Sequence, residues 1–327
     1  MHATAPIGRW AVYVDAATGE PLAREQLLRF ASGNLKINAP VRGPNGQRLD
    51  FAAANLGVVV NGAAAVTSIT GAVSFADGGP ANVATTVLGS FVAVASEAGA
   101  PAATQLALPP GGQVTWIASS DEFLDAQLTT YVHADRVKQF VRAIAPDFAF
   151  LDQQMPAIVN IADICNAFAD GETINFFQSD AQCENTGRIA DVVYHEFGHN
   201  VHFQGIIPGV GFPEGALSEG ISDFLSATIT DSPDLAPGFF KGSDARCASS
   251  TRRAPSGTSP RTTARSTTAG GSSAARCGTC ARRCGTSSAP GPGSRRSTSC
   301  GSRRSAARST CRACTPRSCW PTTTTAT

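Results

Sequence analysis

The stretch His195-Glu196-Phe197-Gly198-His199 decides how the middle of this chain folds. On a helix, two histidines four residues apart lie on one face, about one turn from each other. Two neutral imidazoles at that separation can hold one Zn²⁺ at ~2.0–2.1 Å each, which leaves Glu196 beside the metal rather than on it. The motif therefore predicts a helix that carries a zinc site on one face.

A catalytic zinc site needs a third protein ligand and an open position for water. Glu219 lies 20 residues after His199, and Asp223 follows about one helical turn later. Glu214 is the competing acid, but it stands in a Gly/Pro-rich loop and has no partner four residues later. We therefore interpret Glu219 as the third ligand.

The spacing of these residues resembles that of the thermolysin-like (gluzincin) metallopeptidases. In that family HExxH is followed at this distance by Glu-x-x-x-Asp on a second helix. The likeness extends through Gly215–Glu219 and Ser222–Phe224, and upstream to Asn166-Ala167-Phe168, which looks like the family's substrate-binding edge. The metzincins, the main competing zinc class, need Gly and His where this chain has His202 and Gly205, so that class is excluded.

The resemblance implies a zinc-dependent endopeptidase that acts on polypeptides. Zn²⁺ is the implied cofactor, with Ca²⁺ as a further ion in intact relatives. Glu196 would act as general base, and Asp223 would accept the spare N–H of a zinc histidine, most simply His195. The Asn166 side chain and the Ala167 backbone would hold the substrate main chain.

Two groups that the resemblance also implies are absent from this sequence. Thermolysin-like enzymes carry a histidine downstream of the third ligand, and a tyrosine before it, that donate hydrogen bonds to the oxyanion. No histidine follows His202, and no tyrosine follows Tyr194. Losing one oxyanion donor commonly costs ~10²–10³ in rate. We therefore expect weak activity or none, and a non-catalytic zinc-binding remnant is the competing hypothesis.

Residues 246–327 differ in composition from everything before them. They contain only Arg, Cys, Ala, Ser, Thr, Pro, Gly and one Trp. All 25 acidic residues but only 11 of the 26 basic ones precede Arg246, so the body carries a net charge of −14 and the tail +15. Without Leu, Ile, Val, Phe, Tyr or Met the tail cannot bury enough apolar area to offset chain entropy. We predict that it is disordered.

Three interpretations of this tail compete. An arginine-rich arm would bind phosphate, but any chain of such charge does so, and we expect no specific nucleic-acid partner. A zinc ribbon from Cys277–Cys280 and Cys311–Cys314 would lack apolar packing around the metal. The third interpretation, which we adopt, is a shifted reading frame after about residue 245. A one-base slip across Cys319-Trp320-Pro321 forces Leu-Ala, and across Thr267-Thr268-Ala269 it permits His-Asp-Gly.

The first 30 residues resemble the closing strand and turn of the propeptides that precede such peptidases. Trp10–Val14 alternates like a strand, and Asp15–Glu20 is typical of a tight turn. No basic stretch followed by an apolar one comes after Met1, and no run of 18 apolar residues spans a membrane. Intact relatives are secreted, whereas the chain as written is expected to stay in the cytoplasm as a truncated monomer.

The remaining patterns predict an α+β fold. Residues 31–115 form a small all-β region with short alternating runs such as Thr67–Thr70, and residues 116–245 form the HExxH half of a zincin catalytic domain. Within the second part we expect a capped helix that runs from the stretch Ser119-Ser120-Asp121-Glu122 towards Ile144, strands at 157–161 and 173–177, the zinc helix at 187–203 and the Glu219 helix ending near Thr230.

Two further features concern single side chains. Cys165 and Cys183 either pair in an oxidising compartment or remain buried free thiols, and the sequence leaves both open. His133 falls on the expected helix 121–144, and we interpret it as an exposed or capping histidine rather than a ligand.

Overall fold

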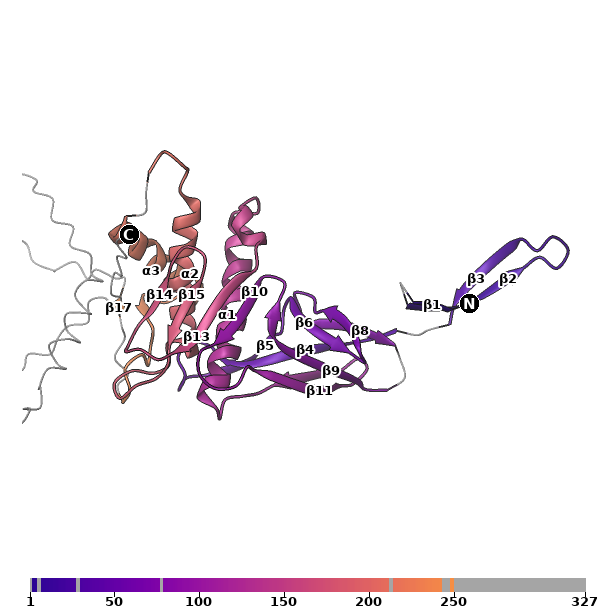
Figure 1. Ribbon diagram of the computed structural model, residues 1–327, viewed down its shortest axis with the longest axis horizontal. Helices are drawn as coiled ribbons and strands as arrows, with labels where there is room; N and C mark the ends of the chain where they lie inside the picture. Colours follow the sequence, from indigo (N-terminus) through magenta and orange to yellow (C-terminus); the bar gives the residue numbers. More distant parts are fainter. Residues whose placement is uncertain are drawn as a thin grey trace, which may run out of the picture.

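The computed structural model describes residues 2–4, 7–27, 30–76, 79–211, 214–242 and 248–249. Within these residues the chain has the predicted α+β architecture, with a strand-rich first half and three α-helices in the second. The disordered-tail and shifted-frame interpretations concern residues that, apart from 248–249, lie outside the described part. Figure 1 shows the helices α2 and α3 near one end of the molecule and the N-terminal hairpin near the other.

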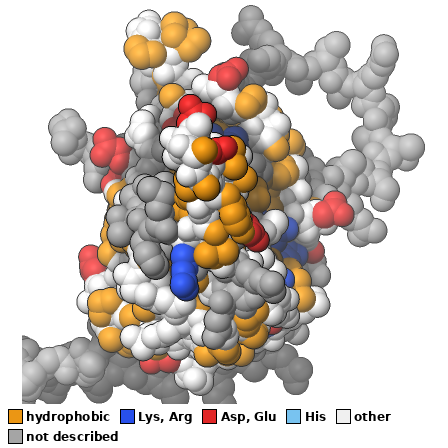
Figure 2. All heavy atoms as spheres, turned by 90° about the vertical axis from the view of Figure 1, so that its right-hand side faces the viewer, with side chains coloured by type: hydrophobic (Ala, Val, Ile, Leu, Met, Phe, Trp, Pro, Cys, Tyr) orange, Lys and Arg blue, Asp and Glu red, His pale blue; other side chains and the backbone are white. Residues whose placement is uncertain are grey.

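The N-terminal residues form a three-stranded antiparallel sheet of β1 (His2–Thr4), β2 (Ile7–Val14) and β3 (Pro21–Gln26). Strands β2 and β3 form the N-terminal hairpin. Its turn is built as the sequence predicts, because the Asp15 carboxylate accepts hydrogen bonds from the N–H groups of Ala17 at 2.7 Å and Thr18 at 2.9 Å. Seen from the hairpin's end (Figure 2), hydrophobic side chains lie at the surface, and the hairpin itself exposes Tyr13 and Leu22.

Residues 30–116 form nine strands in two groups that share one hydrophobic core. The first group is β4 (Phe30–Pro40), β5 (Arg48–Ala52), β8 (Ala72–Ala76) and β12 (Gln113–Trp116). The second is β6 (Leu56–Val60), β7 (Ala63–Val66), β9 (Ala81–Gly89), β10 (Val92–Ser96) and β11 (Ala103–Leu108). Alternate side chains of β4 and β9 are buried, as the period of a strand requires.

The expected strand at Thr67–Thr70 is wrong. Thr67 is buried, and its hydroxyl donates to the Ala53 carbonyl while accepting the Leu56 N–H at 2.9 Å. Beyond it, the Gly71 N–H donates to the Ser68 carbonyl at 2.8 Å and closes a turn. The Thr67 hydroxyl thus bonds to the backbone of residues 53 and 56, and residues 68–71 form a turn instead of pairing as a strand.

The sheet that contains β9 continues into the region of the zinc motif. Its strand order is β14-β15-β13-β10-β9-β6-β7, with β11 also paired to β9. The added strands are β13 (Met155–Ile161), β14 (Ala167–Ala169) and β15 (Ile174–Phe177). Strands β13 and β15 agree with the predicted strands at 157–161 and 173–177, whereas β14 was not predicted as a strand. Because β10 and β13 pair in parallel, hydrogen bonding crosses the division predicted between residues 115 and 116.

Helix α1 (Glu122–Ile144) connects the two halves of this sheet and packs against β10, β13 and β4. It begins where predicted, because the Asp121 side chain accepts the Leu124 N–H at 3.0 Å. The interpretation of His133 as exposed is wrong: the ring is fully buried, 2.6 Å from the Tyr194 hydroxyl and 2.8 Å from the Pro40 carbonyl oxygen. The helix is covered on nearly every side, so a polar residue does not mark its outer face.

The remaining elements complete the second half. A short 3-10 helix η1 (Ala149–Asp152) precedes β13, and η2 (Thr186–Arg188) precedes α2 (Ala190–Gly205) and α3 (Gly215–Thr230). The zinc helix therefore starts slightly later than predicted, after the η2 turn. The pair β16 (Asp234–Leu235) and β17 (Ala248–Ser249) follows. Among the described residues, no helix combines the length and apolar character needed to cross a membrane.

Candidate metal centre

Helices α2 and α3 bring together the residues that the sequence pattern singled out. The Nε2 atoms of His195 and His199 lie 3.1 Å apart. The Glu219 carboxylate approaches both rings, with one oxygen 3.3 Å from His195 Nε2 and the other 3.8 Å from His199 Nε2. Two imidazole nitrogens and one carboxylate thus converge on a single point between the helices.

The separations between these donor atoms agree with one tetrahedral ion. Two donors at ~2.0–2.1 Å from a tetrahedral centre stand about 3.3–3.4 Å from each other. The two Nε2 atoms stand 3.1 Å apart, and two different oxygens of Glu219 lie 3.3 Å from His195 Nε2 and 3.8 Å from His199 Nε2, close to that value. Two histidines and a carboxylate are also a donor set that zinc uses in catalytic sites. The residues therefore fit Zn²⁺ in both chemistry and spacing.

Each histidine has a second partner that orients its ring. His195 Nδ1 lies 3.0 Å from an Asp223 carboxylate oxygen, one turn along α3 from Glu219. His199 Nδ1 lies 2.7 Å from the Ser218 hydroxyl, which the sequence analysis did not identify. Partners of this kind fix the tautomer of a metal-binding histidine and raise its basicity.

The charges around the two rings are unequal. Burial lowers the pKa of His195, but hydrogen bonds to Asp223 and Glu219 outweigh this effect and raise the pKa to about 10. Burial and the neighbouring positive charge of His195 lower the pKa of His199 to about 2. A positive charge at the centre of this group is therefore stabilised by the carboxylates of α3, whether it is a proton or a metal ion.

Glu196 is buried beside the cluster and is not one of the converging donors. Burial raises its pKa to about 8, opposed by the charge of His195 and reinforced by that of Glu219. Its Oε2 atom has no hydrogen-bond partner in the described part of the chain. A buried carboxyl oxygen without a partner, next to a candidate metal site, is available to a water or substrate proton.

Gly198, inside the HExxH motif, is the residue that lets α3 approach. A Cβ atom at this position would stand 2.6 Å from Ser222 Cα and 2.9 Å from Ser222 Oγ. A further contact joins the helices, because the Ser226 hydroxyl donates to the Asp191 carbonyl at 2.9 Å. The sequence carried a signal for this packing, since Ser218, Ser222 and Ser226 recur every four residues along α3.

The competing acid, Glu214, has a different place. It is the N-cap of α3, and its carboxylate accepts the Leu217 N–H at 2.7 Å. Its side chain is exposed, whereas Glu219 is buried. The geometry thus brings Glu219, and not Glu214, to the two histidines.

Asn166 and Ala167 lie at the edge of the large sheet. Strand β14 begins at Ala167 and pairs only with β15, so its other edge is unpaired among the described strands. The Asn166 carbonyl accepts the Thr186 hydroxyl at 2.9 Å, while its side-chain oxygen is buried without a hydrogen-bond partner in the described residues. Helix α2, which carries His195 and His199, packs against β14.

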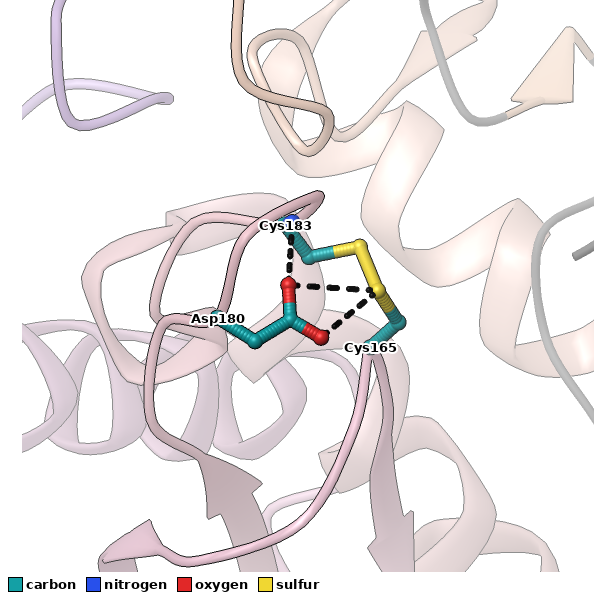
Figure 3. A group of neighbouring side chains, drawn as sticks. All are labelled: Cys165, Asp180 and Cys183. Atoms are coloured by element: carbon teal, nitrogen blue, oxygen red, sulfur yellow. Dashed lines mark hydrogen bonds between the residues drawn. A yellow bond between two sulfur atoms is a disulfide. The ribbon is translucent and has the colours of Figure 1, made fainter. Parts of the chain in front are cut away.

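Cys165 and Cys183 form a disulfide, which settles the alternative that the sequence left open. Figure 3 shows Asp180 beside the bridge, with its carboxylate oxygens 3.5 and 3.7 Å from Cys165 Sγ. These two cysteines and Asp180 are close enough to suggest a second metal group. However, sulfur atoms bonded to each other are not thiolates, and the thiolate is the form that ligates metals. The oxidised triad is therefore no metal site.

Comparisons with known proteins give a limited result. No protein-family model matches the chain, and no curated protein sequence does. Among solved structures, the chain is similar to the precursor of protealysin, a metalloproteinase from Serratia proteamaculans, with 21% sequence identity and a TM-score of 0.32. That match covers 41% of this chain and 46% of the protealysin precursor chain, so it spans less than half of either.

Proposed function

We propose that this chain carries the zinc centre of an endopeptidase of the thermolysin-like kind, with His195, His199 and Glu219 as ligands. One observation carries the proposal: donors from two helices converge at 3.1 to 3.8 Å from each other, while the Glu196 Oε2 atom is buried beside them without a hydrogen-bond partner in the described residues. An ordinary salt-bridged helix pair does not require a second, unpaired buried carboxyl group.

The chemistry follows from the placement of the side chains. When bound, Zn²⁺ supplies an acidified water and polarises the scissile carbonyl group. A cation held by His195, His199 and Glu219 would favour the carboxylate form of Glu196. Glu196 then accepts the proton of the attacking water and returns it to the leaving amine. Asp223 holds the Nδ1 proton of His195 and keeps Nε2 directed at the metal.

The substrate main chain is expected along β14. An edge strand presents unpaired N–H and C=O groups to which an extended peptide can add. The Asn166 carboxamide and the Ala167 backbone stand at the start of this strand, where a peptide would lie beside the metal. This assignment rests on the unpaired edge and on the packing of α2 against it.

Zinc titration of the full chain tests the ligand set. We expect one Zn²⁺ per chain and a loss of more than about a hundredfold in affinity for His199→Ala and for Glu219→Gln, because even outer partners of ligands contribute 10–100-fold. Glu214→Gln is the matched control and should bind zinc like the wild type, since Glu214 caps a helix. Equal losses for Glu214→Gln and Glu219→Gln would contradict the assignment.

A peptidase assay separates the endopeptidase from a non-catalytic zinc-binding remnant. The remnant is the second candidate, because the sequence has no histidine after His202 to stabilise an oxyanion. We expect slow, chelator-sensitive hydrolysis of casein or none. Where hydrolysis is measurable, Glu196→Gln should abolish it while leaving zinc bound. Activity that survives both the chelator and this substitution would refute the proposed mechanism.

A further inference from the structure

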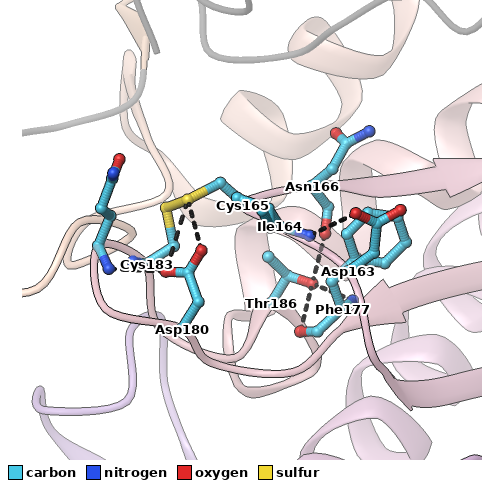
Figure 4. The surroundings of a disulfide bond; sticks show 9 residues. Asp163, Ile164, Cys165, Asn166, Phe177, Asp180, Cys183 and Thr186 are labelled. Atoms are coloured by element: carbon cyan, nitrogen blue, oxygen red, sulfur yellow. Dashed lines mark hydrogen bonds between the residues drawn. A yellow bond between two sulfur atoms is a disulfide. The ribbon is translucent and has the colours of Figure 1, made fainter. Parts of the chain in front are cut away.

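The disulfide lies at the start of the strand to which the substrate edge is assigned. Cys165 directly precedes Asn166 and adopts a left-handed backbone conformation with φ of 49°. Figure 4 shows the bridge running from this residue to Cys183, with Asn166 and Thr186 nearby. The bond thus joins the entrance of β14 to a residue 18 positions later in the chain, beyond β15.

The Cys183 end of the bridge is a fixed point. Cys183 is completely buried, and its N–H donates to the Asp180 carboxylate at 2.6 Å. It pairs with Phe240 across an isolated β-bridge, and the flanking Glu184 N–H donates to the Phe239 carbonyl at 2.9 Å. The surrounding contacts therefore hold Cys183 whether or not the disulfide is present.

The chain that leads to Cys165, at the other end of the bridge, is held mainly by bonds between near neighbours in the sequence. Ile164 is 68% exposed, and its N–H donates only to the neighbouring Asp163 side chain, at 2.7 Å. The Asp163 N–H donates to the Ile161 carbonyl at 2.9 Å, which is again a local bond. Besides the disulfide, the start of β14 is held by the Asn166 carbonyl, which accepts from the Thr186 hydroxyl at 2.9 Å and from the Phe177 N–H at 3.3 Å, and by the pairing of Ala167 with Phe176. The disulfide adds a covalent constraint at Cys165, directly before these contacts.

We propose that the Cys165–Cys183 disulfide positions β14 for an extended peptide, and that it does so without supporting the metal ligands. The proposal rests on the proposed function of this edge. A pre-ordered edge strand loses less conformational freedom when a peptide adds to it, so it binds the peptide more tightly. The metal ligands lie on α2 and α3, which the disulfide does not join. Peptide affinity and zinc affinity should therefore respond differently to loss of the bridge.

Two hydroxamate probes separate the edge from the metal in the full, zinc-loaded chain. Acetohydroxamate contacts the metal alone, whereas a hydroxamate-capped dipeptide also reaches the edge strand. In Cys165→Ala, which leaves the buried Cys183 sulfur in place, we expect affinity for the dipeptide probe to fall about tenfold, as for a loss of ~1.4 kcal/mol. Zinc and acetohydroxamate should bind as in the wild type. The matched control is Cys277→Ala, outside the bridge.

Amide hydrogen exchange supplies a readout that needs neither zinc nor a ligand. Without the bridge we expect faster exchange at residues 163–169 and unchanged exchange in α2. Unchanged exchange at β14, equal loss of both probes, or loss of zinc from Cys165→Ala would overturn the proposal. If the wild-type chain binds no zinc, the proposed function fails, while the exchange measurement still decides whether the bridge orders β14.

Discussion

At the scale of single residues, Gly198 controls the distance between α2 and α3, the two helices of the candidate metal centre. A methyl group at this position would meet Ser222 Cα at 2.6 Å, and backbone atoms cannot rotate away. Gly198→Ala should therefore push α3, with Glu219, away from the histidines. We expect a loss of stability of about 1–3 kcal/mol, as for other overpacked sites.

The same variant should bind zinc about 10–100-fold more weakly in a calorimetric titration, the range seen when ligand orientation is disturbed. Gly220→Ala on α3 is the matched control, because a Cβ there meets nothing within 4 Å. It should keep zinc affinity and gain up to about 1 kcal/mol of helix stability. Normal zinc binding by Gly198→Ala would show that the close contact is not needed.

His133 predicts a dependence of stability on pH. Burial lowers its pKa from 6.5 to about 3. Its Nε2–H donates to the Pro40 carbonyl, so Nδ1 accepts the Tyr194 hydroxyl proton, and the ring is neutral. Below pH ~6.5 His133 is protonated in the unfolded chain but stays neutral in the folded chain. Its contribution to the free energy of unfolding is therefore complete above pH ~6.5 and is lost as the pH falls towards 3.

Chemical denaturation of wild type and His133→Gln between pH 7 and pH 4 checks this expectation. The variant should be less stable at pH 7, and the difference between the two proteins should shrink as the pH falls, by up to about 1.4 kcal/mol per pH unit. If the difference in stability stayed constant over this range, protonation of His133 would not distinguish the unfolded chain from the folded one, and the expectation would be wrong.

At the scale of elements, Asn200 couples helix α2 to the β14–β15 turn. Its side-chain oxygen accepts the Gly171 N–H at 2.8 Å, and its amide donates to the Thr173 carbonyl at 3.1 Å. Asn200→Ala leaves both backbone groups without these bonds, so we expect urea denaturation to show a loss of about 1–3 kcal/mol. Gln204→Ala, which removes one bond to the Gly171 carbonyl from a more exposed side chain, should cost less.

At the scale of the whole molecule, the strand-rich half and the helical half share one sheet and one core. The parallel pair β10–β13 joins them, and buried Asp125 contacts Arg48 of β5 at 2.6 Å and Arg188 of η2 at 2.8 Å. We therefore expect residues 30–242 to unfold in one cooperative transition by scanning calorimetry. Two separate transitions would instead favour independent units divided near residue 115.

Asp125→Ala should lower the temperature of that single transition without splitting it. Removing one partner of a buried ion pair commonly costs about 3–5 kcal/mol, because the remaining charges lose their partner. Arg142→Ala is a control, since the Asp152 side chain of its ion pair is 69% exposed and the pair should contribute less than about 1 kcal/mol. If only one half of the chain melted earlier in Asp125→Ala, the shared core would not be cooperative.

The origin of the change of composition at Arg246 can be tested by resequencing the gene. If the shifted-frame hypothesis holds, resequencing around codons 242–248 should reveal a frame that encodes apolar and acidic residues, with a histidine close to the present Thr267. A confirmed reading frame identical to the present one would reject the hypothesis.

Local patterns along the chain were sufficient to predict most helices and strands and part of the candidate metal centre. The four-residue spacing of His195 and His199 places both on one helical face, and the Asp121 cap marks the start of α1, because these relations depend only on neighbours along the chain. The same periodicity made the α+β class predictable. It could not place Thr67, whose hydroxyl bonds across loops, or His133, whose helix is covered on nearly every side.

Tertiary packing decided the contacts between segments that are distant in sequence. Nothing local requires Ser222 to meet Gly198, Cys165 to reach Cys183, or β10 to pair in parallel with β13. The loop between α2 and α3 permits many orientations of α3, and only close packing of the helices selects the one that brings Glu219 to the histidines. Sequence periodicity specifies which face of an element is apolar, whereas the partner of that face is selected by the complementary shapes of the folded chain.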